Sequence, residues 1–124
     1  MMDEKKKKVL LVDDEIENLQ YLERMLKHKY EVFTALNGAE GVRISILEKP
    51  DLVVMDVQMP LMDGFEACAK IKANDETKNA IVLIVSGMEA YDKRERAFNA
   101  GACEFIDKPF KLRDLIAKIN LKLA

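Results

Sequence analysis

The chain has 124 residues, of which 49% are apolar and 34% charged, and its formal net charge at pH 7 is −2. This length suits one domain with a single buried core, and the composition is that of an ordinary globular protein, not a disordered one. The near balance of charge gives no electrostatic reason to expect a nucleic-acid or membrane partner. We therefore expect one domain, residues 1–124, with no direct contact to nucleic acid or membrane.

The chain carries no recognisable targeting segment or cysteine framework. The lysines at positions 5–8 precede an apolar run that is too short for a signal peptide, and no apolar run is long enough to cross a bilayer. Cys68 and Cys103 have neither the number nor the spacing of a disulfide framework or a zinc site. We interpret both as small core thiols in a reducing compartment and expect a cytoplasmic protein.

Short apolar runs alternate with helical patterns along the chain. Strands are predicted, in chain order, over 8–13, 31–35, 51–56, 80–86 and 103–107. Apolar residues at helical spacing mark three of the intervening helices: Ile16, Leu19, Leu22, Met25 and Leu26; Ala39, Val42, Ile46 and Leu47; and Leu112, Leu115, Ile116, Ile119 and Leu123. Segment 90–100 is the least amphipathic, with Ala97 and Phe98 as its anchors. This alternation predicts an α/β fold of (βα)₅ type, with a parallel sheet and helices on both faces.

Polar side chains gather where the predicted strands end. Asp13 and Asp14 follow the first strand, Asp56 ends the third, Ser86 ends the fourth, and Lys108 follows the fifth. Open parallel sheets bind ligands beyond the carboxyl ends of their strands, so these groups should share one site. Clustered carboxylates without histidine or thiol partners favour a hard cation, and Mg²⁺ fits best because it leaves coordination places for phosphate oxygens.

A structural explanation competes for part of this cluster. Asp14 and Glu15 could simply begin a helix, since acidic residues favour the first helical turn. Asp56 argues for a site, because no helix begins there and Asp63 is the better helix cap. A calcium loop would need several oxygen ligands within a dozen consecutive residues, and no such stretch is present.

The segments LLVDDE, DLVVMDVQMPLMDGFE, VSG and FIDKPF, in this order and spacing, resemble the receiver domain of bacterial two-component response regulators. The resemblance runs from about Lys7 to the last helix. It implies a flavodoxin-like, doubly wound sheet of five strands in the order 2-1-3-4-5, as in the single-domain chemotaxis member of the family.

The resemblance also implies how phosphoryl chemistry is divided among the acidic residues. Asp56 would accept a phosphoryl group from the phosphohistidine of a sensor histidine kinase or phosphotransfer protein. Mg²⁺ would be bound by Asp14, Asp56 and the backbone carbonyl of Gln58, with Asp13 acting directly or through water. The chain would thus be a phosphoryl acceptor, with at most self-catalysed phosphorylation and dephosphorylation, and not an enzyme in the ordinary sense.

The remaining site residues would neutralise charge and transmit the change. Lys108 and Ser86 would contact the phosphoryl oxygens together with Mg²⁺. The resemblance makes the Lys108–Pro109 peptide bond cis and makes Ser86 and Phe105 the switch residues. Phosphorylation would pull Ser86 inward and rotate Phe105, changing the face around the fourth helix and fifth strand that controls a protein partner. Phe105 lacks a hydroxyl group, so we expect a switch that is less sharply two-state.

Several alternatives stay open at this point. The chain could be a stand-alone regulator, which the doubled methionine at its start favours, or a receiver fragment of a larger regulator or hybrid kinase. It could also be a scaffold without phosphorylation, or form a phosphorylation-dependent homodimer through its last two helices. A phosphatase of the haloacid dehalogenase type is disfavoured, because Asp13 and Asp14 are adjacent and lack the D-x-D spacing of that family.

Overall fold

The computed structural model describes residues 5–57, 62–86 and 91–124. Strands and helices alternate as β1 (Lys8–Val12), α1 (Ile16–Leu26), β2 (Glu31–Ala35), α2 (Gly38–Glu48), β3 (Leu52–Asp56), α3 (Gly64–Ala73), β4 (Ile81–Ser86), α4 (Tyr91–Asn99), β5 (Glu104–Asp107) and α5 (Leu112–Lys122). The strands form one parallel sheet in the order β2-β1-β3-β4-β5. The predicted (βα)₅ fold and its strand order are confirmed.

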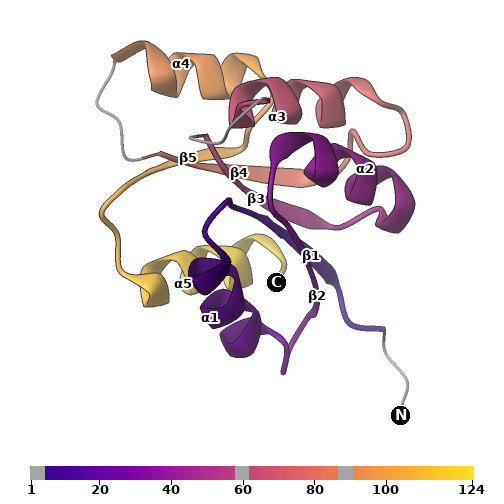
Figure 1. Cartoon of the computed structure of the whole chain (residues 1–124), viewed down its shortest axis with the longest axis vertical. Coiled ribbons are helices and arrows are strands. Elements are labelled where there is room, and N and C mark those ends of the chain that lie inside the picture. The colour runs from indigo at the N-terminus through magenta and orange to yellow at the C-terminus, as the bar shows by residue number, and fades with distance from the viewer. Residues whose placement is uncertain (1–4, 58–61, 87–90) are drawn as a thin grey trace.

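Helices cover both faces of the sheet, with α1 and α5 on one side and α2, α3 and α4 on the other (Figure 1). Successive residues of a strand point to opposite faces, so each central strand serves two cores. In β1, Val9 and Leu11 pack with α1 and α5, whereas Leu10 and Val12 pack on the side of α2 and α3. This two-sided burial explains why the central strands read as continuous apolar runs.

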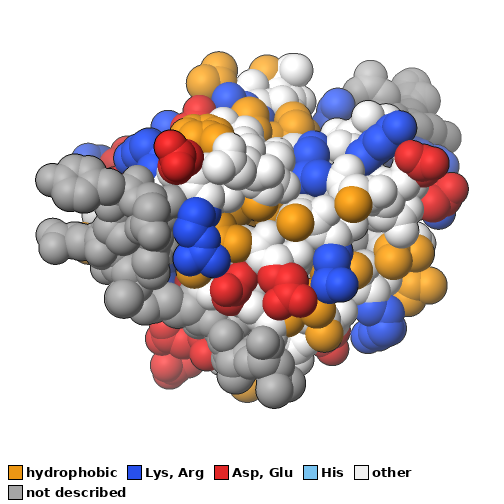
Figure 2. All heavy atoms as spheres, turned by 90° about the horizontal axis from the view of Figure 1, so that it is seen from above, with side chains coloured by type: hydrophobic (Ala, Val, Ile, Leu, Met, Phe, Trp, Pro, Cys, Tyr) orange, Lys and Arg blue, Asp and Glu red, His pale blue; other side chains and the backbone are white. Residues whose placement is uncertain are grey.

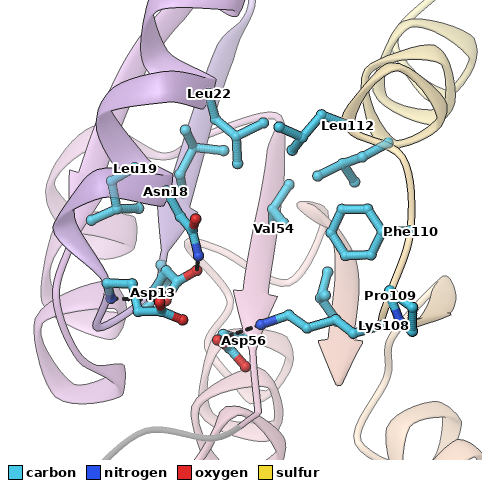
Figure 3. A pocket seen from close by; sticks show the side chains of 15 residues that line it. Asp13, Asn18, Leu19, Leu22, Val54, Asp56, Lys108, Pro109, Phe110 and Leu112 are labelled. Atoms are coloured by element: carbon cyan, nitrogen blue, oxygen red, sulfur yellow. Dashed lines mark hydrogen bonds and ion pairs between the residues drawn. The ribbon is translucent and has the colours of Figure 1, made fainter. Parts of the chain in front are cut away.

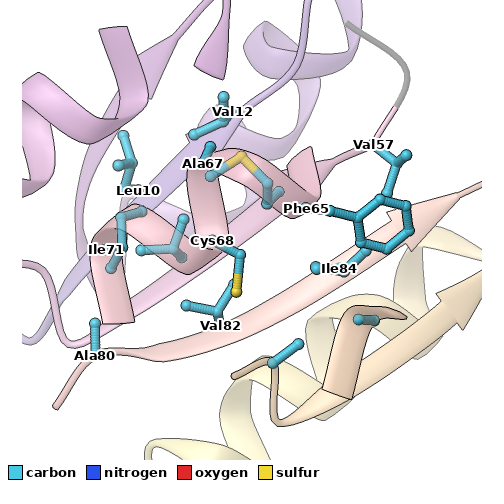
Figure 4. Packing of buried hydrophobic residues seen from close by; sticks show 14 of the residues in the cluster. Leu10, Val12, Val57, Phe65, Ala67, Cys68, Ile71, Ala80, Val82 and Ile84 are labelled. Atoms are coloured by element: carbon cyan, nitrogen blue, oxygen red, sulfur yellow. The ribbon is translucent and has the colours of Figure 1, made fainter. Parts of the chain in front are cut away.

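Helix α3 shows how the second core is filled (Figure 4). Phe65, Cys68 and Ile71 lie on its sheet-facing side and are at most 6% exposed. Burial raises the pKa of the Cys68 thiol to about 11, so this cysteine is a core residue and not a reactive one. Cys103 is exposed, so the prediction of two core thiols is wrong for this residue, which precedes the short edge strand β5.

Side-chain caps fix where α2 and α3 begin. The Asn37 side chain accepts a hydrogen bond from the Glu40 amide at 2.8 Å, and the Glu40 carboxylate accepts one from the Leu36 amide at 2.8 Å. Asp63 accepts a hydrogen bond from the Glu66 amide at 2.9 Å, which confirms Asp63 as the helix cap. Helix α3 therefore begins with a capped first turn, after β3 has ended at Asp56.

The predicted helix faces are partly wrong. In α1, Leu19, Leu22 and Leu26 are buried as predicted, but Ile16 and Met25 are 54% and 49% exposed. Ile16 is the first residue of α1, and Met25 lies in its last turn. In the fourth helix, Ala97 is buried, whereas Phe98, predicted as an anchor, is 47% exposed.

The largest error concerns α2. Its buried residues are Gly38, Gly41 and Ser45. Of the predicted anchors, Val42 is partly buried and packs against the core, whereas Ala39, Ile46 and Leu47 are exposed. The small residues allow α2 to approach its neighbours closely: a Cβ atom at Gly41 would lie 2.9 Å from Val12 Cγ2. Small residues, together with the partly buried Val42 and Ile44, thus form the face of α2 that packs on the core, and hydrophobicity alone does not predict the part made of glycine and serine.

Two buried hydroxyl groups differ in their hydrogen bonding, and we expect opposite effects when each is removed. In the described part of the chain, Ser45 Oγ is buried without a hydrogen-bond partner, whereas Thr77 Oγ1 donates to the Ile71 carbonyl at 2.6 Å. Ser45→Ala should raise the free energy of unfolding by about 1 kcal/mol, because it removes a desolvated polar group. Thr77→Val should lower the free energy of unfolding by about 1 kcal/mol. Urea unfolding measures both, and a Ser45→Ala variant less stable than the parent contradicts the assignment.

The outer surface mixes both signs of charge. Viewed from the side of α2, α3 and α4, basic and acidic side chains are interspersed with apolar ones (Figure 2). This agrees with the small net charge of the chain. Within the described ranges, no helix has both the length and the apolar content needed to cross a membrane.

Candidate functional site

Asp56 and Lys108 meet at the carboxyl edge of the sheet. Asp56 lies two residues after Val54 and Lys108 two residues after Ile106, so both project on the face that α1 and α5 cover. Lys108 Nζ donates to Asp56 Oδ2 at 3.2 Å, across the intervening strand β4. Asp56 is only 5% exposed, so this ion pair holds a nearly buried carboxylate in a fixed direction.

Asp13 lies beside this pair at the end of β1. Its Oδ1 accepts a hydrogen bond from the Glu15 amide at 2.9 Å, and its Oδ2 accepts one from Asn18 Nδ2 at 3.4 Å. Burial is the main reason why the pKa of Asp13 is raised from its usual 3.8 to about 6; the hydrogen bond from the Glu15 amide opposes this rise, and the charge of Asp56 adds to it. The acidic residues at this edge therefore repel one another.

This repulsion is the property a metal ion would relieve. Ligand oxygens of Asp13, Asp14 and Glu15 all lie within 4.8 Å of one another, and these hard donors suit Mg²⁺. Glu15, for which the start of a helix is the competing explanation, also lies in this cluster, and its adjacency to Asp14 is the sequence signal for it. Gln58, whose carbonyl was expected to bind the metal, lies outside the described residues. The described donors fit Mg²⁺ by type and spacing.

A pocket of ≈ 490 Å³ opens beside the acidic cluster, between α1 and α5 (Figure 3). Asp13, Asp56 and Lys108 line its polar end, whereas its interior is apolar and includes Val54 and Phe110. The Lys108 ammonium points across the floor of the pocket toward Asp56. An apolar surrounding strengthens the attraction between these two charges, because it lowers the local dielectric constant.

The structure places the remaining predicted site residues nearby. Ser86 is 1% exposed and ends β4, one residue beyond Val85, the register partner of Asp56. The Ser86 carbonyl accepts a hydrogen bond from the Lys108 amide at 2.8 Å. Phe105 is 6% exposed and belongs to the core on the side of α2, α3 and α4. The Lys108–Pro109 peptide bond is cis.

The raised pKa of Asp13 predicts how stability depends on pH without metal. In the unfolded chain Asp13 ionises near its usual pKa of 3.8, and in the folded chain near about 6. Between these values the folded state retains a proton that the unfolded state has lost, so the contribution of Asp13 to the free energy of unfolding falls as pH rises. We therefore expect Asp13→Asn to be more stable than the parent at pH 7 and to lack this fall.

Urea unfolding at a series of pH values between 4 and 7, with a chelator present, checks this expectation. Asp75→Asn is the matched control, because Asp75 has a 93% exposed side chain and loses the same charge. Its stability profile should run parallel to that of the parent. Equal stability of Asp13→Asn and the parent at pH 7 would show that Asp13 is not destabilised by burial.

Comparison with known proteins agrees with this geometry. The model of the response regulator receiver domain matches residues 9–120. The transcriptional regulatory protein PrrA of Mycobacterium tuberculosis is 36% identical over 117 residues, which cover 94% of this chain and 49% of PrrA. The chain thus spans about half the length of this relative.

Solved structures show the same likeness. A CheY-like response regulator receiver domain protein from Methanospirillum hungatei is 31% identical with a TM-score of 0.88, covering 95% of this chain and 94% of that one. The BeF3-activated receiver domain of DrrB, a Thermotoga maritima protein, is 27% identical with a TM-score of 0.85, covering 95% and 97% of the two chains. With its sheet order, its acidic edge and these matches, the chain belongs to the response regulator receiver domain family.

Proposed function

We propose that the chain, residues 1–124 as one unit, accepts a phosphoryl group on Asp56 in a Mg²⁺-dependent reaction. The donor is the phosphohistidine of a sensor histidine kinase or phosphotransfer protein. One observation carries the proposal: a nearly buried carboxylate, 5% exposed, is held by an ammonium group at 3.2 Å beside a second, repelling carboxylate. Burying a carboxylate is costly even when it is paired, and nearly buried charged groups that face one another cluster at functional sites.

The chemistry follows from the positions of these groups. An oxygen of Asp56 bonds to phosphorus as the bond between phosphorus and the histidine nitrogen breaks, and the electron pair leaves with that nitrogen. Lys108 is near enough to Asp56 to meet the negative charge that spreads over the phosphoryl oxygens. Asp13 and Asp14, with Asp56, would hold Mg²⁺, which supplies further charge neutralisation and orientation when bound.

The proposed output is a change at the face of α4 and β5. Ser86 follows Val85, the register partner of Asp56, and Phe105 of β5 is paired in register with Ile84 of β4. We propose that the new phosphoryl oxygens draw the Ser86 hydroxyl toward Asp56 and that Phe105 adjusts. The altered face would then control a protein target or a second copy of this chain.

Labelling with acetyl phosphate and Mg²⁺ tests the proposal. We expect one phosphoryl group per chain, located on Asp56 by peptide mass mapping and lost slowly afterwards. A chelator should prevent labelling, because the carboxylates at this edge would then repel the incoming phosphate. The labelled chain is measured by intact-protein mass spectrometry against a sample without donor.

The other function classes give different results in the same experiment. Rapid release of inorganic phosphate without a stable label would indicate a phosphatase, and no label at all would indicate a scaffold. Labelling that survives the chelator would contradict the role of the metal. Profiling against purified histidine kinases would then name the donor, since only a cognate kinase transfers its phosphoryl group quickly.

A further inference from the structure

Lys108 directly follows β5, a strand that is paired on one side only. β5 has four residues and lies at the edge of the sheet, so its ladder hydrogen bonds run to β4 alone. The last register pair is Ser86 with Asp107, and the Lys108 amide adds one more bond to the Ser86 carbonyl at 2.8 Å. The direction of the Lys108 side chain therefore depends on how firmly the end of this short strand is fixed.

Arg94 of α4 contacts this strand at two points. Helix α4 lies over β5 (Figure 1). The Arg94 guanidinium carbon is 5.2 Å from the centroid of the Phe105 ring, and Arg94 Nη2 is 3.2 Å from Asp107 Oδ2. Phe105 and Asp107 are two residues apart, so they share one face of β5 and a single planar guanidinium can reach both.

The next residue along the chain faces the other way. Lys108 follows Asp107 directly, and its ammonium reaches Asp56 on the face covered by α1 and α5. We propose that Arg94 is a positioning residue, which fixes the end of β5 through Phe105 and Asp107 and so aims Lys108 at Asp56. This inference rests on the proposed phosphorylation of Asp56. It adds that efficient phosphorylation needs Arg94, which lies on the opposite face of the sheet from Asp56.

Arg94 connects the exposed surface of α4 to the ion pair of Asp56 and Lys108. Arg94 is itself 55% exposed at its side chain, so a partner that binds α4 would reach it directly. Drawing Arg94 away would free the end of β5 and weaken the hold of Lys108 on Asp56. Each contact of Arg94 is individually modest, because exposed ion pairs and cation–π contacts are weak. What matters is that the two contacts act together on alternate positions of the same strand.

The test measures the rate of labelling by acetyl phosphate and Mg²⁺ at a donor concentration far below saturation. Arg94→Gln should lower this rate about fivefold, as expected for losing a cation–π contact together with an exposed ion pair. Arg94→Lys should fall between the parent and Arg94→Gln, because lysine keeps the charge but not the planar contact with Phe105. Asp107→Asn removes the same ion pair from the strand side and should lower the rate about threefold.

Arg96→Gln is the matched control. Arg96 lies on the same helix and places its guanidinium carbon 4.4 Å from the centroid of the Phe65 ring, on α3 and not on β5. This variant loses the same charge and the same kind of contact, so its labelling rate should stay within about twofold of the parent.

A double variant separates positioning from general weakening of the fold. If Arg94 acts through Lys108, then adding Arg94→Gln to Lys108→Gln should not lower the labelling rate further. A fivefold further loss in that background would show that Arg94 acts in some other way and would overturn the proposal. So would Arg94→Gln and Asp107→Asn variants that are labelled at the parent rate. A parent chain that takes no label on Asp56 instead contradicts the proposed function itself, and with it the role of Arg94.

Discussion

Asp56→Asn should lose phosphoryl labelling by acetyl phosphate, with the rate falling by a factor on the order of 10³ or more, as is typical when a nucleophile is removed. The amide oxygen of asparagine carries no full negative charge and forms no stable acyl phosphate. The asparagine side chain has nearly the same shape as aspartate, so the substitution changes the chemistry and not the packing. The Asp56 oxygen is also the atom that Lys108 holds at 3.2 Å, so no other described carboxylate has the same combination of burial and cationic partner.

The measurement is the mass of the intact chain after a fixed time with donor and Mg²⁺. Asp75→Asn serves as the control, because it removes an exposed carboxylate and should be labelled like the parent. Thermal unfolding of both variants establishes that each is folded. If Asp56→Asn is labelled at the parent rate, the phosphoryl group is on another residue and the assignment of Asp56 is wrong.

Gly64→Ala should lower the free energy of unfolding by about 3 kcal/mol, which is near the upper end of the usual cost of adding atoms to a tightly packed site. A Cβ atom at Gly64 would lie 2.5 Å from the carbonyl oxygen of Asp56 and 2.9 Å from Val57 Cα. These are backbone atoms at the end of the central strand, so they cannot move aside as a flexible side chain would. Helix propensity favours alanine over glycine, so a loss of stability must come from this contact.

The same substitution should also slow labelling, because relief of the clash displaces the backbone that carries Asp56. Gly41→Ala is the control: its Cβ would meet the Val12 side chain at 2.9 Å, and the gain in helix propensity of about 1 kcal/mol offsets that contact. Urea unfolding and labelling rates are compared for both variants. A Gly64→Ala variant as stable as Gly41→Ala would show that the backbone of Asp56 and Val57 shifts without cost.

The fold could be predicted from the sequence because its central strands are buried on both faces. β3 is buried at every position, and a continuous apolar run bounded by polar residues is the pattern such a strand leaves. Helix α2 could not be oriented in the same way. The fully buried part of its contact face is made of Gly38, Gly41 and Ser45, and hydrophobic periodicity carries little information about positions that pack through small residues.

The site also has a part that the sequence predicts and a part that it does not. Asp13, Asp56 and Lys108 could be brought together from the sequence, because parallel strands place their carboxyl ends at one edge and the structure has all three lining one pocket. The two contacts of Arg94 with β5 could not, since they depend on the position of α4 over an edge strand. The side-chain pattern of 90–100 shows only that this helix is weakly amphipathic.

The charges along β5 also bear on how the chain behaves at high concentration. An edge strand exposes backbone groups that can pair with a strand of another molecule and start aggregation. β5 is short, and its carboxylates at both ends form ion pairs with neighbouring helices: Glu104 with Lys118 at 3.7 Å and Lys122 at 3.3 Å, and Asp107 with Arg94 at 3.2 Å. Long charged side chains thus flank the open rim of the sheet, which makes it a poor template for growth by strand addition.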